Sequence, residues 1–147
     1  MLRLNILEII ESCRTMEQKL SLALMYTGLR LPQYRVLNLL QQAETLTVTA
    51  LSRKLRITRA TASALANELL DAGLTVSSRN QADRRSFYMR LSETGQARLE
   101  LAKKNIAGVQ ANMERKLNPE MIDALNEFAR IMNKPAQKSA QAPWPPP

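Results

Sequence analysis

The fold of this 147-residue chain is decided by residues 46–95, which read LTVTALSRKLRITRATASALANELLDAGLTVSSRNQADRRSFYMRLSETG. In the first half of this stretch, apolar residues recur at spacings of three and four, which predicts two short helices. Thr47 or Thr49 can cap the first helix, Thr58 can cap the second, and Gly73 stands where the second should end. The period then changes to two on both sides of a short polar loop, which predicts a β-hairpin. Two short helices followed by a hairpin are typical of a winged helix-turn-helix.

Further helices are expected on both sides of this stretch. Residues 3–28 carry apolar side chains at helical spacing, and Pro32 stands in the first turn of a short helix that follows. Beyond the hairpin, Ser92 can cap a long helix, and a last helix is expected to start near Asn118-Pro119. The predicted fold is mainly α with a small β-hairpin wing, a winged helix-turn-helix with N- and C-terminal dimerisation helices. We expect four segments: an N-terminal dimerisation helix at 1–31, the winged helix-turn-helix domain at 32–91, C-terminal dimerisation helices at 92–132, and a disordered Pro-rich tail at 133–147.

Composition excludes several classes of function. The chain has 21 Lys and Arg against 13 Asp and Glu, a net charge of +8, which indicates a polyanionic partner, either nucleic acid or an anionic membrane surface. It contains no His and a single Cys, Cys13, so imidazole chemistry, an internal disulfide and Cys-cluster metal sites are ruled out. Glu8 and Glu11 interrupt what would be the core of a signal peptide, and no apolar run is long enough for a transmembrane helix. We therefore expect a cytoplasmic protein that is not an enzyme, needs no cofactor and binds no membrane.

The second short helix has two faces of different character. At 100° per residue, Ala62, Leu65 and Leu69 share one narrow apolar face. The opposite face is small, polar and lightly charged, and consists of Arg59, Ala60, Ser63, Ala64 and Asn67. Small residues let a helix enter the major groove of DNA, and Arg, Ser, Thr and Asn side chains can bond to base edges. An ordinary solvated face is the alternative, although such faces usually carry more Lys and Glu.

The charge distribution favours nucleic acid as the partner. Residues 52–90 hold eight basic and three acidic side chains, a net charge of +5 in about a quarter of the chain. Arg53 and Lys54 flank the second short helix, and Arg84 and Arg85 stand at the expected hairpin tip. Basic residues on both sides of a helix that fits the groove predict a surface that follows the phosphates of DNA.

Residues 46–95 resemble the DNA-binding domain of the MarR family of bacterial transcription regulators, and the flanking helices extend the likeness to most of the chain. The most specific element is the motif DRR at 83–85, followed by a strand that ends in LSETG at 91–95. The resemblance implies that Arg85 enters the minor groove of DNA and that Asp83 holds it in place. An exposed turn with an ordinary ion pair is the alternative.

The likeness has departures, because Ala64 and Glu68 stand where members of the family often carry basic residues. Sequence preference is therefore expected to rest on the first turns of the second short helix and on the hairpin. The predicted DNA-binding residues are Thr47, Arg53, Lys54, Thr58, Arg59, Ala60, Thr61, Ser63, Asn67, Asp83, Arg84 and Arg85.

Helices outside the winged domain carry apolar stripes. One stripe follows 3-4-3-4 spacing and consists of Leu99, Ala102, Ile106, Val109 and Met113; another consists of Met121/Ile122, Leu125, Phe128/Ala129 and Met132. These stripes and that of the first helix can be buried against each other and a second subunit, with core packing within one chain as the alternative. The resemblance implies a homodimer on a pseudo-palindromic double-stranded operator with half-sites ~10 bp apart, and a transcription regulator that we expect to be a repressor.

The resemblance also implies an effector, a small aromatic or lipophilic acid that binds between the dimer helices and the winged domain. The matching positions in this chain are Leu24, Met25, Tyr26, Arg30 and Tyr34. Cys13 shares the apolar stripe of the first helix, so we expect it to pack as a small hydrophobe, with a redox sensor as the alternative. A winged helix that serves only as a protein-interaction adaptor is a further alternative. A steep loss of DNA affinity with salt distinguishes the regulator from the adaptor.

Overall fold

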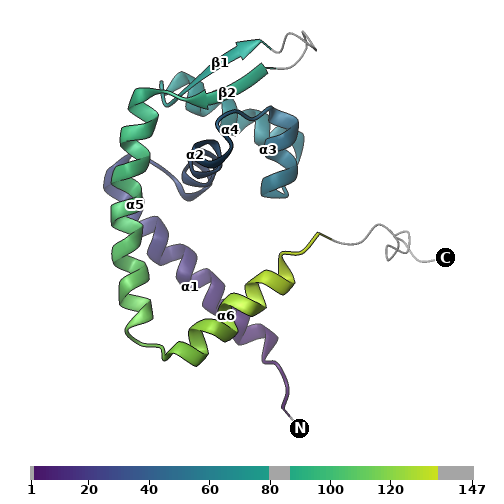
Figure 1. Ribbon diagram of the computed structural model, residues 1–147, viewed down its shortest axis with the longest axis vertical. Coiled ribbons are helices and arrows are strands. Elements are labelled where there is room, and N and C mark those ends of the chain that lie inside the picture. The colour runs from purple at the N-terminus through teal and green to yellow at the C-terminus, as the bar shows by residue number, and fades with distance from the viewer. Residues whose placement is uncertain (1, 80–86, 136–147) are drawn as a thin grey trace, which may run out of the picture. The chain divides into compact units, whose positions relative to one another are not determined.

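The computed structural model describes residues 2–79 and 87–135, and its elements are drawn in Figure 1. The helices are α1 (Ile6–Leu24), the short 3-10 helix η1 (Met25–Thr27), α2 (Leu31–Ala43), α3 (Val48–Leu55), α4 (Arg59–Asp71), α5 (Glu93–Glu114) and α6 (Pro119–Met132). The strands β1 (Thr75–Arg79) and β2 (Phe87–Leu91) pair antiparallel between α4 and α5. The predicted mainly α fold with a small hairpin wing is confirmed. No helix within the described residues combines the length and the apolar character needed to cross a membrane.

Side chains cap the two short helices where the sequence predicted. Thr47, rather than Thr49, caps α3, because its hydroxyl oxygen accepts the Ala50 N–H (3.1 Å). Thr58 caps α4 by accepting the Thr61 N–H (3.1 Å). Each bond satisfies a donor that has no partner within its helix. Past the end of α4, Gly73 has a φ of 73°, in the left-handed region that favours glycine.

The first helix is shorter than the predicted span 3–28. It ends at Leu24, and the chain continues as the 3-10 turn η1 up to Gly28, which has a φ of 74°. The buried Thr27 explains the change, because its hydroxyl donates to the Leu24 carbonyl oxygen (2.6 Å) and accepts the Leu29 N–H (3.2 Å). These two bonds replace the backbone bonds that a continuing α-helix would make.

One hydrophobic core joins the elements of the winged domain to the end of α1 and the start of α5. Its largest fully buried side chains are Leu24, Val36, Leu37, Leu40, Leu51, Leu69, Met89 and Leu99. Leu99 and Ala102 are both 0% exposed, and Ile106 packs against the same core. Core packing within one chain therefore accounts for the first half of the apolar stripe on α5, where we expected a dimer contact.

The hairpin is attached to the domain along its inner strand. Its register pairs Thr75 with Leu91 at the base. Leu46, which precedes α3, forms an isolated bridge with Met89 through backbone hydrogen bonds of 3.1 and 2.8 Å. Because Leu46 and Met89 are both buried, β2 is held by hydrogen bonds and by the core together.

Ser92 and Gly95 join the end of α4 to the start of α5. The Ser92 hydroxyl donates to the Gly73 carbonyl oxygen (2.6 Å) and accepts the Gly95 N–H (3.0 Å), which confirms Ser92 as the cap of α5. The Ser92 N–H donates to the Leu74 carbonyl oxygen (3.1 Å). A Cβ at Gly95 would lie 1.9 Å from that same oxygen. The sequence LSETG at 91–95 therefore meets a packing requirement of the fold.

Most of α1 lies outside the core. Leu24 is its buried residue, while Ile6, Ile10 and Met16 are 63%, 46% and 37% exposed. Cys13 is also exposed. The prediction that Cys13 is packed inside is therefore wrong for the single chain, because the core of this chain reaches only the last turn of α1.

The chain divides into two compact units, Met1–Val109 and Gln110–Pro147. In the second unit Asn118 begins α6 as predicted, since its side chain accepts the Met121 N–H (2.9 Å). None of the residues of α6 is buried, and Leu125 is 53% exposed. The apolar stripe of α6 is therefore exposed, because no other described residue of its unit covers it.

Candidate nucleic-acid interface

Helices α3 and α4 form the helix-turn-helix, with residues 56–58 as the turn (Figure 1). Arg56 adopts the left-handed region with a φ of 57°, which is unfavourable for a residue with a side chain. The conformation is held because the next residue, Ile57, donates its N–H to the Ser52 carbonyl oxygen (3.1 Å) and packs against the core. The start of α4 is thereby fixed relative to α3.

The two faces of α4 are those that the sequence predicted. Ala62 and Leu69 are fully buried. Arg59, Ser63 and Asn67 lie on the opposite face and are exposed. The helix therefore presents a face of small and polar side chains while its other face is anchored in the core.

A groove of about 660 Å³ follows the exposed face of α4. Its other walls are the start of α3 and one face of the hairpin. Five of the predicted DNA-binding residues line it: Thr47, Arg59, Ala60, Ser63 and Asn67. The structure thus gathers side chains from two helices at a single concave surface.

Six residues that line this groove were not predicted from the sequence: Val48, Thr49, Leu70, Ser77, Phe87 and Met89. The strand period could have placed Phe87 and Met89 on one face of the hairpin, and the register puts Ser77 opposite Met89. Alternation does not tell which element that face packs beside, so the groove itself was missed. Among the apolar members, Phe87 is 47% exposed and provides a surface of the kind that contacts thymine methyl groups in DNA.

The other predicted residues lie around the groove or outside the described part of the chain. Arg53 and Lys54 are exposed in the last turn of α3. Thr58 and Thr61 are exposed at the start of α4, where their hydroxyl oxygens are 2.9 Å apart and hydrogen-bonded. The motif at 83–85, with Asp83, Arg84 and Arg85, lies outside the described residues.

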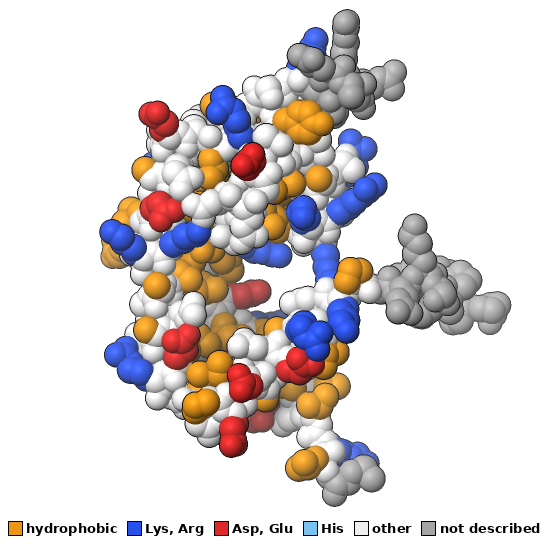
Figure 2. Space-filling view, viewed as in Figure 1, with side chains coloured by type: hydrophobic (Ala, Val, Ile, Leu, Met, Phe, Trp, Pro, Cys, Tyr) orange, Lys and Arg blue, Asp and Glu red, His pale blue; other side chains and the backbone are white. Residues whose placement is uncertain are grey.

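Basic side chains lie in this groove and at its edge. Figure 2 shows Lys and Arg side chains gathered over the α3 side of the winged domain. On the hairpin, the Arg79 guanidinium carbon lies 5.9 Å from the centre of the Phe87 ring, within the range of a cation–π contact. Because Phe87 lines the groove, this contact keeps a cation at its edge.

The five residues predicted to bind an effector occupy different environments. Leu24 is fully buried in the core, whereas Met25 and Tyr26 are 58% and 90% exposed. Arg30 contacts α4. Tyr34 is half-buried against the core, and this burial raises the pKa of its phenol. The five positions therefore differ in exposure and contacts, and the effector site stays a prediction.

A helix-turn-helix with a two-stranded wing beside its second helix defines a winged helix-turn-helix protein. The model of the MarR family matches residues 27–86, which contain α2, α3, α4 and β1. This part of the chain matches the MarR family, and the resemblance noted in the sequence is confirmed there. None of the curated protein sequences compared with the chain matches it significantly.

Solved structures of this family share the fold over most of the chain. The transcriptional repressor CouR, bound to a 23-mer DNA duplex, is 25% identical, with 89% of this chain and 93% of that chain covered and a TM-score of 0.83. Sco3205 from Streptomyces coelicolor, a MarR family regulator in complex with DNA, is also 25% identical, with 93% and 91% covered and a TM-score of 0.80. A mutant of MarR from E. coli, complexed with operator DNA, is 16% identical, with 86% and 91% covered and a TM-score of 0.79.

Proposed function

We propose that this protein is a sequence-specific transcription regulator that binds double-stranded DNA in the cytoplasm. The observation that carries the proposal is α4, whose apolar face is fixed in the core while Arg59, Ser63 and Asn67 face outwards along the groove. A helix held in this way can enter the major groove without losing its support. Arg, Ser and Asn offer the donors and acceptors that base edges recognise.

The charges around α4 supply the part of the affinity that does not depend on sequence. Arg53 and Lys54 are exposed in the last turn of α3, where they can bind the phosphates that flank the major groove. The motif DRR at 83–85 brings further arginines, and by family resemblance Arg85 enters the minor groove with Asp83 orienting it. The proposed division is that Arg53 and Lys54 hold the DNA backbone, while α4 and the hairpin read the sequence.

We further propose that the active species is a homodimer. Large apolar side chains are exposed on α1 and α6, including Leu7 (76%), Leu22 (62%) and Phe128 (38%), and a second subunit would cover them. The four-segment division, with the N- and C-terminal helices serving dimerisation, belongs to this proposal. Two copies of α4 related by a twofold axis would contact half-sites ~10 bp apart on a pseudo-palindrome.

Two finer features of the proposal rest on family resemblance. Repression of transcription is the expected outcome, and the structural neighbour CouR is described as a transcriptional repressor. Release by a small aromatic or lipophilic acid is expected as well, through contacts at exposed positions such as Met25, Tyr26 and Arg30. Since Leu24 is 0% exposed, it would contribute to such a site only by supporting it.

The experiment that tests the proposal selects bound duplexes from a random DNA library and then measures affinity by fluorescence anisotropy over a series of salt concentrations. We expect an enriched pseudo-palindrome, tight binding to it, and an affinity that falls steeply as salt rises. Sedimentation at the same protein concentration should give twice the mass of the chain. Equal affinity for the selected duplex and a scrambled one would contradict sequence-specific binding. A monomer that binds the selected duplex would contradict the dimer alone.

A further inference from the structure

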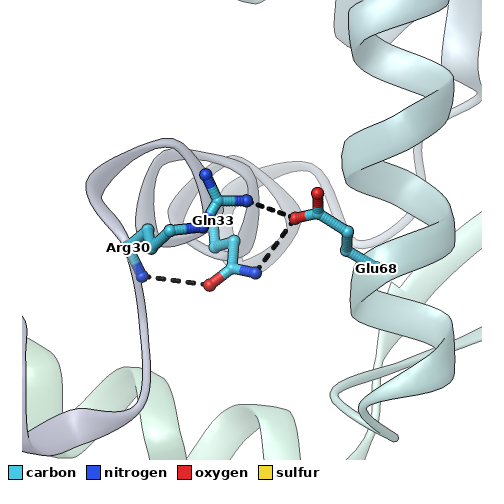
Figure 3. Close-up of polar contacts among 3 residues, drawn as sticks. All are labelled: Arg30, Gln33 and Glu68. Carbon is cyan, nitrogen blue, oxygen red and sulfur yellow. Dashed lines mark hydrogen bonds and ion pairs between the residues drawn. The ribbon is translucent and has the colours of Figure 1, made fainter.

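A polar cluster ties the recognition helix α4 to the start of α2 (Figure 3). An Arg30 terminal guanidinium nitrogen lies 2.5 Å from a carboxylate oxygen of Glu68, and the Gln33 side-chain amide donates to the same oxygen (3.2 Å). Gln33 also accepts the Arg30 backbone N–H (3.0 Å). We call Arg30, Gln33 and Glu68 the α2–α4 clamp.

The side chain of Arg30 is better suited to a contact with α4 than to capping α2. Arg30 occupies the N-cap position of α2, where Ser, Thr, Asp or Asn usually accepts a backbone N–H. An arginine has no acceptor, and here its side chain extends to α4 instead. Gln33 fixes its own orientation, because the oxygen of its amide is held by the Arg30 N–H and the nitrogen therefore faces Glu68.

Glu68 is placed where it can control the rotation of α4 about its axis. It follows Asn67, which lines the groove, and precedes Leu69, which is fully buried, so it stands at the border of the two faces. With a helix radius of about 5–6 Å including side chains, a rotation of about 10° moves a groove-lining atom by about 1 Å. A base-edge hydrogen bond does not survive such a displacement, because its donor–acceptor distance spans only about 0.5 Å.

We propose that Arg30 and Gln33 are positioning residues that hold α4, through Glu68, in the rotation at which Ser63 and Asn67 read bases. The proposal rests on the DNA-binding function proposed above. The clamp is a sequence-discrimination device, since an ion pair as exposed as this one contributes little to the stability of the fold. It also gives a structural use to Glu68, an acidic residue on the helix that is proposed to read DNA.

Electrostatics alone predicts a different effect for Glu68→Gln, namely tighter binding with unchanged discrimination. Removing a negative charge from a DNA-binding helix should raise affinity for every duplex, whatever its sequence. The clamp predicts instead that Glu68→Gln weakens discrimination, because α4 loses its restraint. Asp71→Asn is the matched control, since Asp71 is exposed at the end of the same helix and its loss changes the net charge equally.

The test measures the dissociation constants of each variant for the selected duplex and for a scrambled duplex, at one salt concentration. The readout is the dissociation constant for the scrambled duplex divided by that for the selected duplex. We expect Glu68→Gln and Arg30→Gln each to reduce this ratio by roughly 1.5-fold to fivefold, the range that an exposed ion pair can supply. The double variant Arg30→Gln/Glu68→Gln should reduce the ratio no more than either single variant. The reversed pair Arg30→Glu/Glu68→Arg should recover part of the lost discrimination. Asp71→Asn should leave the ratio unchanged.

Two results would overturn the clamp. One is an unchanged ratio in Glu68→Gln, and the other is an equal change of the ratio in Glu68→Gln and Asp71→Asn. If the wild-type chain itself fails to discriminate between the duplexes, the proposed function fails, and hydrogen exchange of the free protein then decides on the clamp. Faster exchange of the α4 amides in Glu68→Gln than in wild type supports the restraint, and identical exchange overturns it.

Discussion

Replacing Gly95 with alanine tests the packing between the start of α5 and the end of α4. The new Cβ would lie 1.9 Å from the Leu74 carbonyl oxygen and 2.9 Å from its carbonyl carbon, whereas ordinary contact begins at 3.4 Å. Both atoms belong to the backbone, so no side chain can rotate away. The start of α5 must move, and the Ser92 N–H bond to the same Leu74 oxygen (3.1 Å) is then stretched or lost.

The expected loss of stability has three contributions, of which two destabilise the protein and one offsets part of the cost. Overpacking in a tight core costs about 1–3 kcal/mol. A weakened hydrogen bond from Ser92 adds about 1 kcal/mol. Alanine is a better helix former than glycine by up to about 1 kcal/mol, which offsets part of this cost. We therefore expect Gly95→Ala to lower the free energy of unfolding by about 1–3 kcal/mol.

The control is Gly108→Ala, in the same helix, because a Cβ at Gly108 meets no atom within 4 Å. That substitution should be neutral or stabilise the protein by up to about 1 kcal/mol. Both variants are measured by urea unfolding at one protein concentration, with the transition followed by circular dichroism. Unfolding of Gly95→Ala at the same urea concentration as Gly108→Ala would refute the reasoning, because helix propensity would then outweigh the close contact.

Three further outcomes are expected. Arg59→Ala should change the selected DNA motif, whereas Lys54→Ala should weaken binding to all duplexes alike and reduce the salt slope by about 1; an unchanged motif in Arg59→Ala would contradict the division of roles. Cys13→Ser should leave operator binding intact, because Cys13 lies on α1, away from the groove; DNA release by organic peroxide in wild type but not in the variant would show a redox sensor instead. Burial raises the pKa of the Tyr34 phenol above the ordinary value of 10.0. An ultraviolet titration of the wild type should therefore show a tyrosine step above this value, and the step should be absent in Tyr34→Phe. The stability that depends on the neutral phenol should be lost as pH rises through the raised pKa.

Features with a local cause could be predicted from the sequence. Thr58 caps α4 through a bond to a residue three positions away, and Gly73 ends it through its own backbone freedom. The faces of α4 follow from helical geometry alone, so Ala62 and Leu69 were assigned to the core correctly. In each case the cause lies within a few residues of its effect.

Features that join distant segments could not be predicted. Arg30 and Glu68 are 38 positions apart, and nothing in the neighbourhood of either residue identifies the other. The groove has the same origin, because Phe87 reaches it only through the placement of the hairpin beside α4. Cys13 shows a related difficulty. Its apolar stripe was recognised, but periodicity cannot tell whether a stripe is covered by its own chain, and here it is exposed.

The hydrogen bonds of the Ser92 hydroxyl determine how far the length of the wing can vary. One oxygen receives the N–H of Gly95 and donates to the carbonyl of Gly73, so the chain leaving α4 and the chain entering α5 are closed together at the base of the hairpin. The register is therefore anchored at this base, independently of the residues between Arg79 and Phe87. Insertions between Arg79 and Phe87 should shift neither strand, because lengthening a connection between two fixed ends adds only a small entropic cost. The wing can thus diversify in length and sequence while α4 keeps its place.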